Sequence, residues 1–371
     1  MMKRRNLAVA LLLATGLPPV AHAADSLDQG FVPSGNVQVI GRFYDAQPSG
    51  IAALPDGRLV LGFPRSAKDH IGPRLAVYAE NKLTPFPDAA AQDRFVSPLG
   101  MTVDAQGRLW VLDEGMLAGK GTIAGAQKLF EIDPKTNTIL STVTIAAPAL
   151  LPDSHVNDVR IDLTHGSAGT AFITDTSTGT HPALIVIDLA TGHQRRILAD
   201  TKPVMPQEGF VAVMDGHAAR YDAAHPAMPQ GGANGIGLSS DQQTLFWQPQ
   251  TSRELYAAPT SVLADPTATE ATIEKAVQDK GETGMGDGMA TGPDGALYIT
   301  DDERHGILKY APDGGISLIA HDPHMVEPDG LTYGDGALYG TIGQWARLPV
   351  FHGGRDMQHL PYLVIKIPLS K

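Results

Sequence analysis

The sequence has no cysteine, so neither disulfide bonds nor cysteine-ligated structural zinc can stabilise this chain of 371 residues. It also lacks an excess of basic residues, since 28 Lys and Arg stand against 40 Asp and Glu, a formal net charge of -12. Nucleic-acid binders need a basic surface, so this balance argues against that class. The composition instead favours cationic or neutral small ligands, or a bound cation, as partners.

Several catalytic sequence motifs are also missing. The chain contains no G-x-S-x-G elbow, no H-E-x-x-H pair, no Walker A loop and no EF-hand loop. A dinucleotide-binding fingerprint within a βαβ unit is absent as well. The sequence therefore gives no support to the enzyme classes that depend on these motifs.

Residues 1–23 are typical of a signal peptide. Lys3 to Arg5 are basic, Ala8 to Gly16 form an apolar run too short to span a membrane, and Ala21 to Ala23 fit a cleavage site. No later apolar run is long enough for a transmembrane helix. We expect an exported protein, periplasmic or secreted, in which residues 24–371 form a single domain with no membrane span.

Turn-forming residues, in contrast, are abundant, with 40 Gly and 28 Pro, which indicates many short strands. In the stretch Ser97 to Gly115, an apolar strand, a turn ending in Gly107 and a second strand follow one another. The same unit recurs at roughly the 40 to 50 residues of a propeller blade. The residues just before the first strand of each unit are Ser49, Leu99, Asn157, Asn234, Asp287 and Asp329.

Two further strands have no partner within their own units. Val37 to Tyr44 lacks an inner partner, and Tyr362 to Ile367 lacks an outer one. Pairing them would close a ring, so the sequence predicts an all-β, six-bladed β-propeller whose N-terminal strand completes the last blade. The segment 202–232 has no strand periodicity, and we interpret it as a loop over one end of the central channel or as a surface insertion.

Four stretches, SPLGMTVDAQGRLWVLDEG, HVNDVRIDL with AFITDTSTGTHPALIVIDLATGHQRRIL, GANGIGLSSDQQTLFWQPQTSRELYAAPTSVL and GMGDGMATGPDGALYITD, together resemble the major royal jelly protein and yellow family. The resemblance covers about Ser97 to Asp301. It implies a six-bladed propeller, secretion and, in some members, a channel pocket that holds amines. Some relatives are linked to dopachrome conversion. The chain lacks the cysteines of many animal members, so it resembles a bacterial relative to which the insect roles are not transferred.

Four of the residues that precede the inner strands carry amide or carboxylate oxygens: Asn157, Asn234, Asp287 and Asp329. We expect these oxygens to converge at one rim of the channel, where such hard ligands would suit Ca²⁺. The arrangement resembles the gluconolactonase and paraoxonase type of propeller, in which Asn and Asp hold a catalytic cation. The alternative interpretation is that these residues only shape the turns that lead into the strands.

A second set of carboxylates follows the second strand of several units, namely Asp113, Glu114, Asp175 and Asp301. These residues are candidates for an acidic ring that binds an amine, or alternatively for capping loops through backbone N–H groups. Phe210, within the segment 202–232, is a candidate for ligand contact because it lies in a predicted loop. His155, two residues before Asn157, is the candidate general base.

Three hypotheses follow for function. The first is an exported propeller that binds an amine- or quinone-like small molecule in its channel, with or without weak isomerase activity. The second is a Ca²⁺-dependent lactonase, in which the cation would polarise a carbonyl group. The third is a non-catalytic interaction scaffold whose channel is filled by side chains. The first requires an enclosed pocket, and the second a bound cation beside a base.

Overall fold

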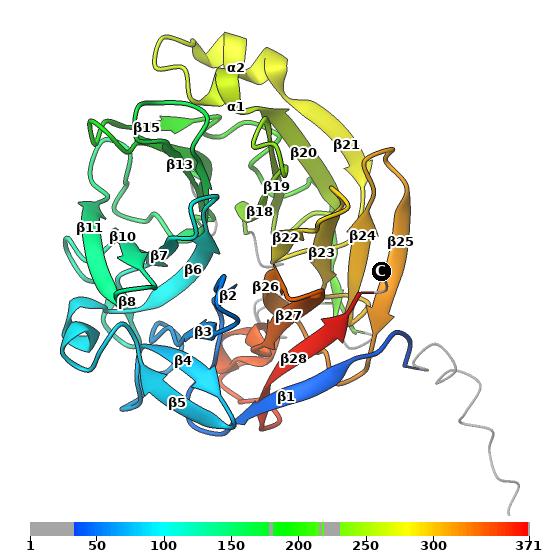
Figure 1. Ribbon diagram of the computed structural model, residues 1–371. Coiled ribbons are helices and arrows are strands. Elements are labelled where there is room, and N and C mark those ends of the chain that lie inside the picture. The colour runs from blue at the N-terminus through cyan, green and yellow to red at the C-terminus, as the bar shows by residue number, and fades with distance from the viewer. Residues whose placement is uncertain (1–32, 178–180, 215–216, 219–230, 370–371) are drawn as a thin grey trace, which may run out of the picture. The chain divides into compact units, whose positions relative to one another are not determined.

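Six four-stranded antiparallel sheets form a ring around a central axis in the computed structural model (Figure 1). The structure describes residues 33–177, 181–214, 217–218 and 231–369. The compact unit runs from Pro33 to Lys371, and the predicted signal peptide lies outside the described residues. The ring confirms the predicted six-bladed β-propeller.

Five of the sheets take their strands in chain order, from an inner strand beside the axis to an outer one. The first two sheets are β2 (Ile51–Ala53), β3 (Leu59–Gly62), β4 (Leu75–Ala79) and β5 (Lys82–Pro85), then β6 (Pro98–Val103), β7 (Leu109–Asp113), β10 (Lys128–Asp133) and β11 (Thr138–Thr144). The third is β12 (Val156–Asp162), β13 (Thr170–Asp175), β14 (Ala183–Asp188) and β15 (Gln194–Ile197). The fourth and fifth are β18 (Ala233–Leu238), β19 (Thr244–Pro249), β20 (Glu254–Pro259) and β21 (Gln278–Glu282), then β22 (Met289–Thr291), β23 (Leu297–Asp301), β24 (Gly306–Tyr310) and β25 (Ile316–His321).

The sixth sheet joins the two ends of the ring. It consists of β26 (Pro328–Gly334), β27 (Ala337–Ile342), β28 (Tyr362–Pro368) and, as its outer strand, β1 (Gln38–Phe43). β1 pairs with β28 in antiparallel register from Gln38 opposite Lys366 to Phe43 opposite Tyr362. This pairing confirms the predicted closure by the N-terminal strand.

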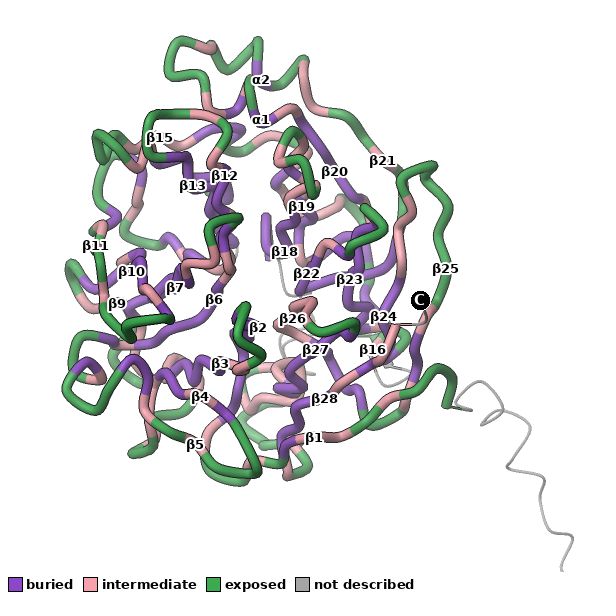
Figure 2. Tube along the Cα trace, in the orientation of Figure 1, coloured by how far each residue is buried: buried purple, intermediate pink, exposed green. Residues whose placement is uncertain are grey.

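The turns between inner and second strands follow from local sequence. Gly57, Gly107, Gly295 and Gly336 all have positive φ in these turns, a conformation that costs glycine little because it has no Cβ. The hydrophobic core lies between neighbouring sheets. Trp247 and Phe172, for example, belong to one cluster that joins the third and fourth sheets. Figure 2 shows that the inner and middle strands are mostly buried and that exposure concentrates in outer strands and turns.

Neighbouring inner strands approach each other closely where they begin. A Cβ atom on Gly288 would lie 2.0 Å from the carbonyl oxygen of Asp329, and one on Gly330 would lie 2.2 Å from that of Ser49. Five of the six inner strands have Gly at the position of Gly288 and Gly330, and the third has Asp158 there. In four inner strands the pairing register with the second strand is irregular across this position. These contacts bring the residues at the rim close to one another.

Few described elements lie outside the six sheets. Two short hairpins are β8 (Met116–Leu117) with β9 (Gly121–Thr122), and β16 (Val213–Met214) with β17 (His217–Ala218). The second hairpin is a small correction to the segment 202–232, for which no strand was predicted; residues 215–216 and 219–230 lie outside the described part. Helices α1 (Thr260–Leu263) and α2 (Glu270–Ala276) precede β21. None of the helices in the described ranges is both long and apolar enough to cross a membrane.

Candidate functional site

A cavity of about 720 Å³ lies at the rim where the inner strands begin. This volume is within the range of small-molecule sites, about 300 to 1,000 Å³. Five of the six residues that were predicted to precede the inner strands line it, namely Ser49, Leu99, Asn157, Asp287 and Asp329. In the structure Leu99, Asn157 and Asp329 are the second residues of β6, β12 and β26. Its outer wall comes from residues 345–359 and from the hairpin of β16 and β17, which contribute Trp345, Met214 and Ala218. The segment 202–232 therefore does border this end of the channel.

Four carboxyl groups lie in the polar wall of the cavity, together with four histidines and Arg347. Burial raises the pKa of Asp287 well above its usual value, and the charges of Asp329, Glu327 and Asp158 raise it further. The nearby Asn234 amide opposes this rise. Uncompensated buried negative charge is costly, so burial favours the protonated form of Asp287 and a nearby cation would favour its charged form.

Asp329 has two side-chain hydrogen-bond donors in the wall. The hydroxyl of Ser49 donates to its Oδ2 over 2.5 Å, and the indole N–H of Trp345 donates to the same oxygen over 3.0 Å. Burial raises the pKa of Asp329, and these two hydrogen bonds oppose the rise. The contacts tie the outer wall at Trp345 to the rim of the sixth and first sheets.

His155 and Glu114 form a pair within the cavity wall. The His155 Nε2 atom lies 2.8 Å from Glu114 Oε2, and the Ser97 hydroxyl donates to Glu114 Oε1 over 2.7 Å. Burial lowers the pKa of His155, but the hydrogen bond to Glu114 and the charges of Glu114 and Asp175 outweigh it, so the net shift is upward. With 32% of its side chain exposed, His155 can exchange a proton with a molecule in the cavity.

Asp113, another of the predicted acidic residues, accepts hydrogen bonds from backbone N–H groups near the cavity. Asp113 is buried and accepts hydrogen bonds from the N–H groups of Val96, Ser97 and Gly115 at 2.6 to 2.8 Å. Burial raises its pKa to about 6, against the effect of these hydrogen bonds. Asp113 is not part of the cavity wall, so of this pair only Glu114 reaches the cavity.

Asp175 and Asp301 also lie outside the cavity wall. Asp175 is fully buried and accepts hydrogen bonds from the hydroxyl groups of Ser154 and Ser177 and from Arg196. Asp301 is equally buried and accepts a hydrogen bond over 2.5 Å from Arg304. Each also accepts a backbone N–H, that of His155 for Asp175 over 2.9 Å and that of Arg304 for Asp301 over 3.3 Å, which is the kind of contact that the loop-capping alternative describes.

Phe210 lies behind the wall. It is 9% exposed and packs in one cluster with Ala212 and Met285, both of which line the cavity. The guanidinium carbon of Arg253 lies 4.7 Å from the centre of its ring. Phe210 thus supports two wall residues and is not itself part of the surface that a ligand would touch.

Three of the four proposed metal ligands line the cavity, and the fourth does not. Asn157, Asp287 and Asp329 line the cavity, whereas Asn234 is 1% exposed and absent from its wall. Neither polar atom of the Asn234 side chain makes a hydrogen bond of ordinary geometry in the described part of the structure, although the amide lies near enough to Asp287 to lower the pKa of that carboxyl group. The oxygen donors and this buried amide fit the chemistry of Ca²⁺. In the same described ranges, however, no group of three or more His, Asp or Glu is arranged to hold a metal ion.

Sequence reasoning missed several wall residues. His155 was selected because it lies two residues before the rim position, and the same offset in the fifth and sixth units leads to Met285 and Glu327, which also line the cavity. Applying that offset to every unit would have found both. The wall residues between positions 346 and 359, after β27, belong to no repeated pattern, so the sequence carried no comparable signal for them.

The sequence model described as "Major royal jelly protein" matches residues 96–330. Similar solved structures include a gluconolactonase from Xanthomonas campestris, with TM-score 0.53 and 15% identity over 91% of this chain and 95% of that one. A calcium-binding regucalcin from Agrobacterium tumefaciens has TM-score 0.52 and 14% identity over 90% and 98%. A virginiamycin B lyase from Staphylococcus aureus has TM-score 0.50 and 15% identity over 90% and 99%.

At these identities, the three structures show the shared fold alone. No curated protein matches the sequence. The match of the family model spans more than half of the chain and coincides with the stretches in which the sequence resembles that family. This protein therefore belongs to the major royal jelly protein family.

Proposed function

We propose that this protein is exported and binds a small amine- or quinone-like molecule in the cavity of about 720 Å³ at the channel rim. The observation that carries the proposal is the wall itself, in which buried carboxyl groups lie beside apolar side chains. Asp287, Glu327 and Asp329 are polar members of that wall, and Met285 and Trp345 contribute apolar surface. An organic cation would match both components.

The carboxyl groups give a physical reason to prefer an amine. Like charges and burial raise the pKa values of Asp287 and Asp329, so their negative charge is costly in the empty cavity. An ammonium group would compensate that charge and release protons on binding. We therefore expect amine affinity to rise with pH as long as the amine stays protonated.

Calorimetric titration with aromatic amines, compared with neutral molecules of the same shape, tests the proposal. We expect saturable binding of the amine and at least tenfold weaker binding in Asp287→Asn. Asp45→Asn is the matched control because Asp45 is exposed and not part of the cavity wall. Absence of saturable amine binding, or equal affinity in both variants, would refute the proposal. Fractionation of expressing cells tests export separately.

The pair of His155 and Glu114 is the group on which weak isomerase activity would depend. A quinone-like ligand that isomerises needs a proton removed at one atom and returned at another, and His155 can carry it while Glu114 holds the ring. His155→Gln should therefore abolish turnover of such a quinone and retain binding. Equal turnover by the variant would remove His155 from this role.

A Ca²⁺-dependent hydrolase is the second candidate, and it is favoured by the buried Asn234 amide, which makes no hydrogen bond of ordinary geometry in the described part of the chain and lies near Asp287. Asn157, Asn234, Asp287 and Asp329 would hold the ion, which would supply Lewis-acid polarisation of a lactone carbonyl. His155 would take the proton of the attacking water. Thermal unfolding with EDTA and with added Ca²⁺ tests this candidate.

A site saturated at a hundredfold excess over its Kd should stabilise the fold by about 2.7 kcal/mol. The resulting rise in Tm should be lost in Asn157→Ala, which removes an amide oxygen. An unchanged Tm with Ca²⁺ would exclude a strong site and leave the amine proposal standing.

A further inference from the structure

A second cavity, of about 270 Å³, lies at the opposite ends of the inner strands. All six inner strands contribute to it, through Ala53, Val103, Arg160, Leu238, Thr291 and Thr332. It shares no lining residue with the cavity at the rim. The channel of the propeller therefore has two separate chambers, and the proposed function uses only one.

The two chambers differ in charge. Arg160 and Asp104 are the charged residues of the second chamber. The Asp104 carboxylate already has partners, because it accepts hydrogen bonds from Arg108 Nε over 2.8 Å and from the Trp110 indole N–H over 2.9 Å. Arg108 also pairs with Glu131 over 2.6 Å, and Glu131 is not among the residues of the chamber. Arg160 is the one cationic residue among the described residues of the chamber wall.

The guanidinium of Arg160 has backbone partners only. Its Nη1 donates to the Val159 carbonyl oxygen and its Nη2 to the Met289 carbonyl oxygen. Within the described ranges no carboxylate lies at ion-pair distance from it, and its other N–H groups have no protein partner. Asp158, two residues earlier on the same strand, is the charged group that acts on Arg160, and it lies beyond ion-pair distance of the guanidinium in the described part of the chain.

Two neutral donors lie in the same wall. The Thr332 hydroxyl oxygen accepts a hydrogen bond from the Ala53 N–H over 3.3 Å, so its own proton remains for another acceptor. Gln242 accepts through Oε1 from the Leu163 N–H over 2.7 Å, while its amide nitrogen has no partner among the described residues. Both side chains line the chamber that contains Arg160.

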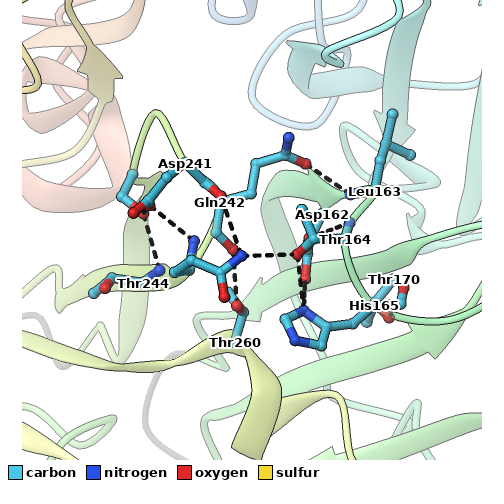
Figure 3. A network of polar contacts seen from close by, with 11 residues as sticks. Asp162, Leu163, Thr164, His165, Thr170, Asp241, Gln242, Thr244 and Thr260 are labelled. Carbon is cyan, nitrogen blue, oxygen red and sulfur yellow. Dashed lines mark hydrogen bonds and ion pairs between the residues drawn. The ribbon is translucent and has the colours of Figure 1, made fainter.

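A polar network holds the Gln242 part of this wall in place (Figure 3). The Thr260 hydroxyl donates to the Gln242 carbonyl oxygen over 2.8 Å, and Asp162 accepts from the Thr164 N–H over 2.7 Å. Together with the hydrogen bond from Leu163, these contacts join the β12–β13 turn to the β18–β19 turn (Figure 3). The donor of Gln242 is thus fixed before any ligand arrives, which lowers the entropy cost of binding.

We propose that this second chamber binds a small anion with a carboxylate or phosphate group, held by Arg160 and supported by Thr332 and Gln242. The planar guanidinium matches the paired oxygens of both groups and can donate to two of them at once. A volume of about 270 Å³ suits inorganic phosphate or a short carboxylic acid. The protein would then carry sites for ligands of opposite charge at the two ends of its channel.

Calorimetric titration at constant ionic strength, with inorganic phosphate in one series and succinate in the other, tests this site. We expect wild-type protein to bind at least one of them saturably, and the series that shows the higher affinity identifies the group. Arg160→Gln should weaken binding at least tenfold. Arg94→Gln is the matched control, because Arg94 contacts Thr142 on an exposed surface and should leave the affinity unchanged.

Thr332→Val provides a second test if Arg160→Gln lowers the amount of folded protein. It keeps the shape of the side chain, removes one donor and should weaken anion binding about threefold. Asp287→Asn should leave anion binding intact, so failure of the amine proposal and failure of this one are distinguishable. No saturable binding of either anion by wild type, or equal binding by Arg160→Gln and Arg94→Gln, would overturn the proposal.

Discussion

Replacing Asp158 with Asn should make the protein more stable at alkaline pH and leave it nearly unchanged in acid. Asp158 occupies the position that is Gly in the other five inner strands, so its carboxyl group enters the crowded centre of the ring. Burial raises its pKa from 3.8 to about 7, opposed by Arg160 and assisted by Asp329. Asn has nearly the same shape and never ionises.

The sign and the size follow from linkage. Because the pKa of Asp158 is higher in the folded than in the unfolded state, wild-type stability falls as the pH rises from 3.8 through about 7. A shift of this size corresponds to about 4 kcal/mol, at about 1.4 kcal/mol per pH unit. The free energy of unfolding of Asp158→Asn should therefore exceed that of wild type by close to zero at pH 4 and by up to about 4 kcal/mol at pH 8.

Urea unfolding of both proteins from pH 4 to pH 8 at constant ionic strength measures this difference. Asp241→Asn is a control of opposite sign, because hydrogen bonds from the Ser239 hydroxyl and the Gln243 N–H lower the pKa of Asp241. That variant should be less stable than wild type at neutral pH and approach it in acid. A difference for Asp158→Asn that stays constant with pH would refute the reasoning.

Two further predictions concern the frame of the site. Gly330→Ala should destabilise the fold by about 1 to 3 kcal/mol, because its Cβ would lie 2.2 Å from the Ser49 carbonyl oxygen. Gly72→Ala is the control and should cost almost nothing, because no atom lies nearer than 3.7 Å to its Cβ. Equal Tm values for the two variants would contradict the close approach of the inner strands. Arg196→Gln should lower the free energy of unfolding in urea by about 3 kcal/mol or more, because it leaves the buried carboxylate of Asp175 without its cation. A decrease below about 1 kcal/mol would show that the remaining hydrogen bonds stabilise this carboxylate sufficiently.

The ring could be predicted because its signals are local and repeated. Alternating apolar residues on either side of a glycine turn mark the first two strands of each sheet, and two unpaired strands at the ends imply the pairing of β1 with β28. Strands without such signals were missed. β21 follows helices α1 and α2 and is almost wholly exposed, so neither a nearby turn nor an apolar face marked it as the outer strand of the fourth sheet.

The candidate site was predictable only where it repeats the blade pattern. Rim positions such as Asn157 and Asp287 follow from the register of the units, and both line the cavity. The direction of a carboxylate, in contrast, depends on donors that come from other parts of the chain. Asp113 and Glu114 are neighbours in sequence, yet one accepts from backbone N–H groups and the other reaches His155 in the cavity wall.

The pairing of β1 with β28 also sets the order in which the ring is completed during synthesis. β1 is the first described strand to leave the ribosome and its partner is the last, so five sheets can form from consecutive segments while the sixth is incomplete. Contacts between such distant residues form late, because loop closure must precede them. The sixth sheet of the nascent chain therefore stays incomplete, and β1 stays unpaired, until β28 has been synthesised.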